Sequence, residues 1–142
     1  MKDFFFLSQK DIKGIINKNQ TQVIRVANSQ MINNYILSNV GKQLKIKEHY
    51  FMRDGEVKYM ATDDRMKNEK LCHAANMPEH LIRLSLKIEC VEIKLLSDLT
   101  DEDAKIHGFE SKEKLIRRYK FLKCINENTE VLVFNFTYNL KN

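Results

Sequence analysis

The segment Leu81–Leu96 constrains the fold of this chain more than any other feature of the sequence. Leu84, Leu86, Ile88 and Cys90 fall on one side of it, and Arg83, Lys87, Glu89 and Val91 fall on the other. A repeat of two residues is typical of a β-strand, because successive side chains of a strand point to opposite faces. A long strand with one apolar face needs a sheet and a second layer to bury that face.

Five shorter segments also have the composition of strands and are bounded by turn signals. The Asp54-Gly55 pair is typical of a two-residue hairpin turn, so it predicts that the segments on either side of it pair with each other. The first segment holds three phenylalanines and is expected to be a short buried strand. The five segments are Phe4–Leu7, Thr21–Val26, Gln43–Phe51, Glu56–Ala61 and Glu130–Tyr138.

Three residues with hydroxyl side chains mark the starts of helices. Ser8 precedes a helix expected over Asp11–Asn17, and Thr100 precedes one expected over Asp101–Ile106. Ser111 precedes a third, more polar helix. A hydroxyl at such a position accepts a hydrogen bond from a backbone N–H of the first turn, which would otherwise have no partner.

The order of these elements favours one class of fold. The amphipathic Gln30–Val40 predicts a further helix, and the polar Thr62–His80 predicts a long loop. The strands and helices do not have the spacing of βαβ units, so a parallel sheet is not expected. We expect an α+β protein built on a small, mixed, mostly antiparallel β-barrel with helices packed on it. The 142 residues, 43% of them hydrophobic, suit a single domain over residues 1–142.

Charge is distributed unevenly along the chain, whose net charge is +5. Residues 1–60 carry 10 Lys or Arg against 5 Asp or Glu, and the remainder is balanced. A local positive field attracts polyanions such as nucleic acid. The alternative is an ordinary solvated surface, because an A/T-rich coding sequence would produce the same abundance of Lys and Asn.

The cysteines and the apolar segments indicate in which cellular compartment the protein is expected. Three cysteines without a Cys-x-x-Cys pair favour a reducing cytoplasm over a disulfide framework. No apolar run reaches the length of a membrane-spanning helix, so a cytoplasmic protein without membrane association is expected. Cys72, His73, His80 and Cys90 lack the two close pairs typical of zinc sites, so neither a metal nor another cofactor is expected.

Two segments combine particular residues in a distinctive order and spacing. The first is Leu7-Ser8-x₃-Ile12-x₂-Ile15-Ile16-x₃-Gln20-Thr21-Gln22-Val23-Ile24-Arg25. The second is Asn76-Met77-Pro78-x₄-Arg83-Leu84-x-Leu86-x-Ile88, continuing to Leu95-x₃-Leu99-Thr100-x₂-Asp103-Ala104-x₃-Gly108-Phe109. Together they resemble the ASCH domain (activating-signal cointegrator homology), especially its short phage and prophage versions, over residues 4–138.

The resemblance implies a PUA-like β-barrel and RNA binding, because ASCH domains are generally regarded as RNA-binding modules. Some small members are amidohydrolases that act on acetylated cytidine, and they use a Lys, a Thr and a Glu. The matching positions here are Gln20, Val23 and His107. An amide cannot act as a base and an aliphatic side chain cannot act as a nucleophile, so this activity is not expected.

The expected function is binding of RNA or single-stranded nucleic acid in a basic cleft. The cleft is expected between the segments Thr21–Arg25, Glu48–Tyr50 and Met77–Arg83. Arg25 matches an arginine of the family and suits a phosphate or a base edge, with an ion pair to Glu48 as the alternative. The candidate binding residues are Gln20, Thr21, Arg25, Lys45, Lys47, Glu48, Tyr50 and Arg83.

Several of these candidates have a second interpretation. Lys45 and Lys47 are two residues apart and therefore share one face of a strand. They either bind successive phosphates or protect a sheet edge against aggregation. Tyr50 is either a platform for a stacked base or a core residue. Arg83 either lines the cleft or lies on a solvated strand face.

Two other functions are alternatives to nucleic-acid binding. One is a hydrolase acting on a modified nucleoside or on RNA with a changed residue set around Lys18, Thr21 and His107. The other is a protein-interaction module whose basic surface binds an acidic partner. The oligomeric state, the choice between RNA and DNA and the preferred ligand sequence are not encoded in any motif that we find.

Overall fold

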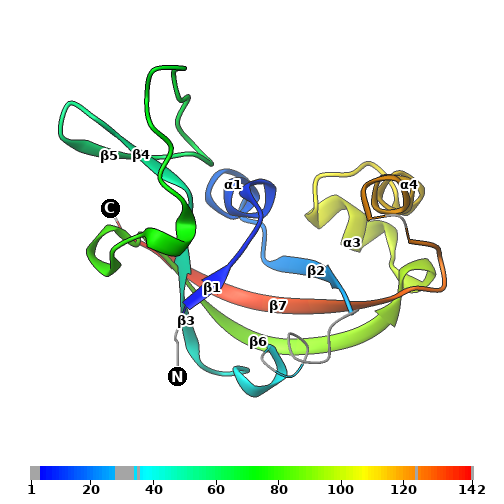
Figure 1. Cartoon of the computed structure of the whole chain (residues 1–142). Coiled ribbons are helices and arrows are strands. Elements are labelled where there is room, and N and C mark those ends of the chain that lie inside the picture. The colour runs from blue at the N-terminus through cyan, green and yellow to red at the C-terminus, as the bar shows by residue number, and fades with distance from the viewer. Residues whose placement is uncertain (1–3, 28–33, 35, 124, 142) are drawn as a thin grey trace. The chain divides into compact units, whose positions relative to one another are not determined.

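The computed structural model describes residues 4–27, 34, 36–123 and 125–141 and contains both helices and strands (Figure 1). The expected α+β composition is therefore confirmed. The helices are α1 (Gln9–Lys18), α3 (Asp101–Ile106) and α4 (Lys112–Lys123), with 3-10 turns η1 (Ala74–Asn76), η2 (Glu79–Leu81) and η3 (Leu96–Asp98). The strands are β1 (Phe4–Phe6), β2 (Gln22–Val26), β3 (Gln43–Lys47), β4 (Tyr50–Arg53), β5 (Glu56–Tyr59), β6 (Leu84–Leu95) and β7 (Glu130–Leu140).

Hydrogen bonding arranges the strands in a five-stranded sheet of order β1-β3-β6-β7-β2 and a separate ribbon of β4 and β5. Strand β1 is parallel to β3, whereas β3 and β6 are antiparallel, as are β2 and β7. Leu44 lies opposite Leu86, and Ile24 lies opposite Val133. The sheet is thus mixed and mostly antiparallel, as expected from the absence of βαβ spacing.

Strand β6 has the alternation that the sequence predicts, but only in its first half. Leu84, Leu86 and Ile88 are buried, and Lys87 between them is exposed. Beyond Ile88 the expectation of a buried face fails, because Cys90 is exposed. One side of a strand is buried only where another layer covers it, and the sequence period alone does not show where that cover ends.

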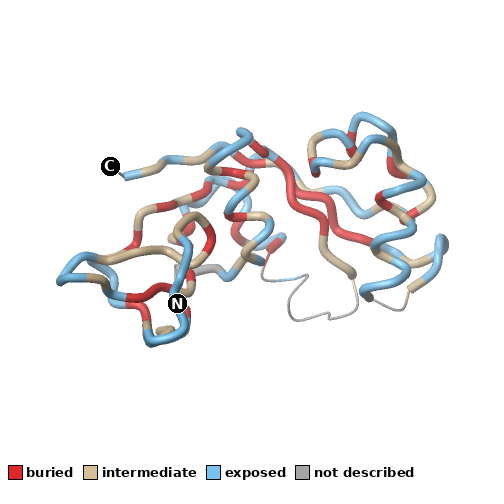
Figure 2. Tube along the Cα trace, turned by 90° about the horizontal axis from the view of Figure 1, so that it is seen from above, coloured by how far each residue is buried: buried red, intermediate tan, exposed pale blue. Residues whose placement is uncertain are grey.

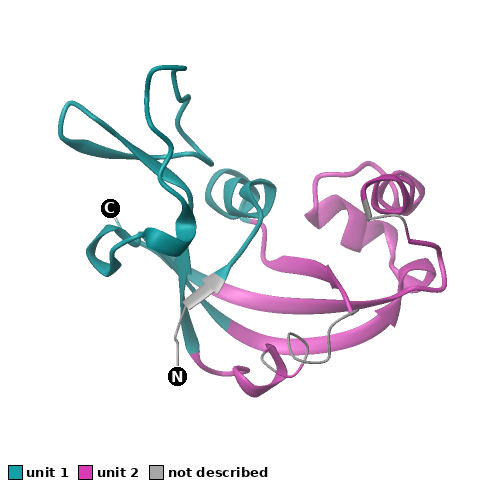
Figure 3. Ribbon diagram, in the orientation of Figure 1, with its two compact units in different colours: residues 1–19, 43–87, 138–142 teal, residues 20–42, 88–137 magenta. Residues whose placement is uncertain are grey.

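The chain divides into two compact units, each built from separate stretches of sequence (Figure 3). Unit 1 comprises residues 1–19, 43–87 and 138–142. Its helix α1 begins as expected, with the Ser8 side chain accepting a hydrogen bond from the N–H of Asp11, and Ile12 and Ile15 are fully buried. A second buried cluster in unit 1 consists of Tyr50, Met77 and Ile82.

Unit 2 comprises residues 20–42 and 88–137 and has its own apolar core. Helix α3 begins at the N-cap Thr100, as its sequence predicts. Thr100 and Asp103 form a capping box, and this end of the helix packs through Leu99 and Ala104. Leu115 of α4 and residues 131–134 of β7 are also buried. Figure 2 shows the burial of each described residue along the chain trace. The buried core cluster is Ile24, Leu96, Leu99, Ala104, Leu115, Val131 and Val133.

The segment expected as one strand, Gln43–Phe51, is two strands separated by Glu48 and His49. The side chains of these two residues explain the break. The Glu48 carboxylate is buried and accepts two hydrogen bonds from Arg83, and Nδ1 of His49 accepts one from the Ala74 N–H. These long-range side-chain contacts have no signature in local strand propensity.

The hairpin turn between β4 and β5 is confirmed. Asp54 and Gly55 have φ angles of 52° and 80°, and Arg53 pairs with Glu56 across the turn. Two successive positive φ angles define the turn type whose twist matches that of the strands, and Gly adopts this conformation without steric cost.

Two other expectations concern the strand over Phe4–Leu7 and the helix over Gln30–Val40. The interpretation of Phe4–Leu7 as buried is wrong at Phe6, which is 49% exposed, because three-residue β1 lies at the edge of the sheet next to β3 alone. Most of the helix expected over Gln30–Val40 lies outside the described residues, although residues 36–38 are helical. Within the described part of the chain, no helix has the length and apolar character needed to cross a membrane.

Candidate functional site

A cavity of about 550 Å³ in unit 1 is lined by cations from three separate parts of the chain. Lys45 of β3, Arg83 before β6 and Lys141 after β7 line it, together with the carboxylate of Glu79. Arg83 and Lys141 are joined by a backbone hydrogen bond from Lys141 N–H to the Arg83 carbonyl, at 2.7 Å. We call this the basic cavity, because three cations outnumber one carboxylate on its wall.

The pKa of Glu79 reflects the positive charges around the basic cavity. Its carboxylate accepts a hydrogen bond from Lys45, and this contact lowers the pKa of Glu79; the charges of Lys45, Lys141 and Lys47 lower it further. The pair is largely exposed, so it adds little to stability. Its significance is spatial, since Lys45, Lys47 and Lys141 all lie close enough to Glu79 for their charges to lower its pKa.

Arg83 is held in place rather than free to move. Its guanidinium donates to both oxygens of Glu48 at 3.0 Å and lies 3.9 Å from the centre of the Tyr59 ring. The Tyr59 hydroxyl in turn donates to the Leu81 carbonyl at 2.8 Å. Burial raises the pKa of Glu48, and the hydrogen bonds and charge of Arg83 offset only part of this effect.

The partner of Glu48 differs from the one considered from the sequence. Both carboxylate oxygens accept from Arg83, so Arg83 takes the position that we considered for Arg25. Arg25 lies on β2 in unit 2, half-buried, opposite Leu132. The solvated strand face considered for Arg83 does not apply either, because only 14% of its side chain is exposed.

Tyr50 is not available as a stacking platform in this structure. It is 9% exposed and packs with Met77 and Ile82, so the core interpretation applies. Burial also raises the pKa of its hydroxyl. Lys47, in contrast, is only half-buried and remains within reach of the field around Glu79.

The remaining candidates lie in different units. Lys18 is exposed at the end of α1 in unit 1. Thr21 is exposed in unit 2, where its carbonyl accepts from the Phe136 N–H. Gln20 is buried, and its side-chain Nε2 donates to the Gln22 carbonyl at 2.8 Å. Val23, at the position of the amidohydrolase Thr, is a core residue.

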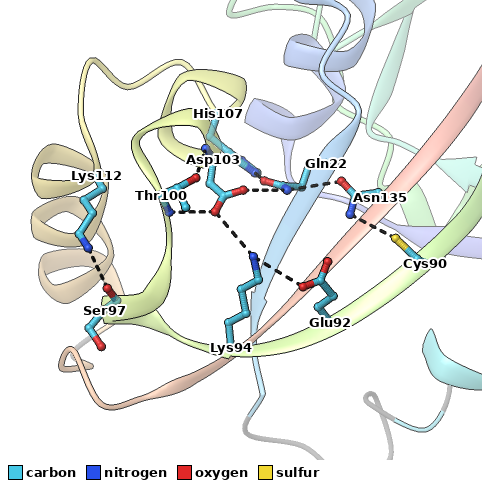
Figure 4. Close-up of polar contacts among 10 residues, drawn as sticks. All are labelled: Gln22, Cys90, Glu92, Lys94, Ser97, Thr100, Asp103, His107, Lys112 and Asn135. Carbon is cyan, nitrogen blue, oxygen red and sulfur yellow. Dashed lines mark hydrogen bonds and ion pairs between the residues drawn. The ribbon is translucent and has the colours of Figure 1, made fainter.

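Unit 2 contains a buried polar network that sequence reasoning did not anticipate (Figure 4). Gln22 lies at its centre: its Oε1 is 3.1 Å from His107 Nε2, and its Nε2 donates to Asp103 Oδ1 at 3.2 Å and to Asn135 Oδ1 at 3.4 Å. Gln22 and Asn135 are direct partners across β2 and β7. The available signal was a polar residue within each of two largely apolar segments, Gln22 in the first and Asn135 in the second, but the sequence does not show that these two residues are paired.

Every member of this network has a partner. Since Gln22 Oε1 only accepts, His107 Nε2 carries the proton of their hydrogen bond. Burial alone would raise the pKa of Asp103, but hydrogen bonds from Thr100 and Gln22 and the charge of Lys94 outweigh it, and the pKa is lowered. From the sequence, His107 is interpreted either as a residue at the end of a helix or as a functional group. In the structure it is the buried C-cap residue of α3.

Comparison with protein-family models, with curated proteins and with solved structures found no match. The ASCH resemblance therefore remains a prediction from the sequence. Among the described residues, no group of three or more His, Cys, Asp or Glu side chains is placed to hold a metal ion, and Cys72 and Cys90 are free thiols.

Proposed function

We propose that this chain is a PUA-like, ASCH-type domain of the reducing cytoplasm that binds RNA or another single-stranded nucleic acid. The observation that carries the proposal is the basic cavity, where Lys45, Arg83 and Lys141 line one hollow and Lys47 contributes to the same field. Lysine side chains bind phosphates as mobile point charges, and the cavity volume is within the usual range for ligand sites.

The arrangement of charge suits a flexible polyanion. Arg83 is fixed by Glu48 and Tyr59, so it provides an oriented cation in the lining of the cavity. Lys45 is 44% exposed, and its ion pair with exposed Glu79 is easily exchanged for one with a phosphate. A single strand can bend to follow such a local surface, whereas the alternatives of an acidic protein partner or a modified nucleoside need further recognition elements.

Fluorescence anisotropy with short single-stranded RNA, single-stranded DNA and duplex, titrated over salt, tests this proposal. Lys45→Ala and Lys141→Ala should each weaken binding several-fold and reduce the salt slope by about one. Lys114→Ala is the matched control, because Lys114 also pairs with an exposed glutamate, Glu110, but lies on α4. Equal losses in all three variants would point to non-specific attraction, and no binding at low salt would refute the proposal.

Arg25 is tested separately, because it lies in unit 2. Arg25→Ala should weaken binding several-fold if the arginine of the resembled family contributes to the interface, and should leave the fold intact. Circular dichroism of the variant checks the fold. Wild-type affinity in this variant would restrict the interface to unit 1.

A further inference from the structure

We propose that the second half of β6 is an interface at which two copies of this chain pair edge to edge. This half comprises residues 89–95 and lies entirely in unit 2. We call it the β6 edge. The inference concerns the assembly of the protein and does not depend on the binding of nucleic acid.

The β6 edge lacks a strand neighbour on one side among the described residues. Strand β6 lies between β3 and β7 in the sheet, but β3 pairs only with its first half, from Leu84 to Lys87. The Gly41 N–H adds one hydrogen bond on this side, to the Ile88 carbonyl at 2.7 Å. From residue 89 onward, no described strand continues the sheet there. Such an edge presents backbone N–H and C=O groups that can pair with another strand.

The side chains of the β6 edge are also largely uncovered. Five of the seven residues 89–95 are exposed and none is buried, whereas Leu84, Leu86 and Ile88 in the first half of the strand are buried. Ile93 is 54% exposed and Leu95 is 36% exposed. An exposed strand edge with apolar side chains is a surface at which sheets of separate molecules join, unless charges or bends prevent it.

Charged and apolar side chains occupy opposite faces of the β6 edge. Figure 4 shows Glu92 and Lys94 on the side of β6 toward Asp103. Lys94 Nζ lies 3.6 Å from Glu92 Oε2 and 4.0 Å from Asp103 Oδ2. Successive side chains of a strand point to opposite faces. The other face therefore carries three apolar residues: Val91, Ile93 and Leu95.

A two-fold axis through Ile93 makes the β6 edge complementary to itself. In an antiparallel pair, residues directly opposite each other point to the same face. With the axis at Ile93, Glu92 lies opposite Lys94 of the second copy, and Val91 lies opposite Leu95 of the second copy. Ile93 lies opposite its own equivalent. The charge pair and the apolar contact each occur twice, as in the interface of a symmetric dimer.

The neighbouring registers fit less well. Moving the axis to Glu92 or to Lys94 places like charges opposite each other at the centre, which destabilises an antiparallel pair. Moving it to Val91 places Glu89 opposite Ile93. The edge therefore specifies one register and one occupant, a second copy of this chain. Because seven residues form a small interface, we expect a transient dimer with a Kd that is roughly micromolar or weaker.

Charge exchange across the proposed axis tests this inference. Glu92→Lys and Lys94→Glu each place like charges opposite each other in two positions, so each variant alone should dimerise roughly tenfold more weakly than the wild type. An equimolar mixture of the two variants pairs opposite charges again and should recover most of the association. Sedimentation velocity without nucleic acid, from about 1 µM to about 1 mM protein, measures the dimer in each sample.

Ile93→Asp provides a second test, because it places two carboxylates at the axis and should abolish the dimer. Ile93 is exposed, so this variant should keep the fold, which circular dichroism checks. Met52→Asp is the matched control and should dimerise like the wild type, because Met52 is a similarly exposed strand residue of unit 1. Equal losses in these two variants would overturn the inference.

Three other results would also overturn it. A wild-type chain that stays monomeric at the highest concentration would assign the β6 edge to a different partner. A dimer that persists in Ile93→Asp would place the interface elsewhere on the molecule. A mixture of Glu92→Lys and Lys94→Glu that associates no better than either variant alone would exclude the proposed register.

Discussion

His107 Nε2 donates to Oε1 of Gln22 at 3.1 Å and thereby links the C-cap of α3 to strand β2. The two residues are 85 positions apart in the sequence, and both are buried. The same Gln22 amide donates to Asp103 at the other end of the short helix. One glutamine therefore fixes both ends of α3 against the sheet of unit 2.

Replacing Gln22 by Met should destabilise the protein by about 2 kcal/mol, because the buried side chains of His107 and Asp103 each lose a hydrogen bond to Gln22. Chemical denaturation of the wild type and the variant measures this difference. Gln43→Met makes the same chemical change on an exposed strand residue and should remain within about 0.5 kcal/mol of the wild type. Equal effects of the two substitutions would mean that the network contributes nothing beyond local propensity.

Arg83→Ala should cost about 3 kcal/mol near neutral pH, because it leaves the buried Glu48 carboxylate without its partner. Burial already raises the pKa of Glu48, and the loss of Arg83 raises it further. The carboxyl is protonated in both the folded and unfolded states below its ordinary pKa, so the cost should shrink at about pH 4. Urea unfolding at both pH values measures the change.

The double variant with Glu48→Gln and Arg83→Ala controls this prediction. It removes the charge that Arg83 balances, so near neutral pH it should be more stable than Arg83→Ala alone. A cost that is independent of pH and of residue 48 would instead assign the role of Arg83 to its contact with Tyr59.

Glu69 should make stability depend on acid pH. Hydrogen bonds from Arg53 and the Met66 N–H lower its pKa from 4.5 to about 2. A lowered folded pKa means that the contribution is complete above pH 4.5 and is lost as the pH falls through about 2. The stability difference between the wild type and Glu69→Gln should therefore be larger at neutral pH than near pH 2. A constant difference across this range would contradict the assignment.

Glu79→Gln should strengthen the binding of nucleic acid. The substitution removes the only carboxylate among the residues described as lining the basic cavity, and it releases Lys45 from its ion pair. A few-fold gain in affinity at low salt, with a steeper salt slope, is expected from one added net positive charge. Glu110→Gln on α4 is the matched control, because Glu110 pairs with Lys114 in the same exposed manner. A gain of the same size in both variants would indicate a general charge effect.

Local sequence patterns predicted the local structure well. The caps at Ser8 and Thr100 and the Asp54-Gly55 turn depend on hydrogen bonds or φ angles within a few residues, so their sequence signals are complete. The strands β6 and β7 were found from their local residue pattern, although their hydrogen-bond partners lie on distant strands. Barrel closure and the PUA-like class depend on contacts between distant segments, and they remain predictions.

The candidate site was predicted less completely. Lys45, Lys47 and Arg83 were singled out from charge and position, and they do lie on or near one cavity. Lys141 and the Gln22 network were missed, because only the folded chain brings them to their partners. Tyr50 was singled out as a binding residue but is buried in the core. The local sequence does not distinguish an aromatic strand residue that is buried from one that is available to a ligand.

The interleaving of the two units affects the order in which the protein can be completed during synthesis. The basic cavity needs Lys45 and Arg83, but also Lys141, which is translated after all of unit 2. A nascent chain therefore carries Lys45 and Arg83 well before the third cation of the basic cavity is added. Unit 1 can therefore form the whole wall of this cavity only after every residue of unit 2 has been synthesised.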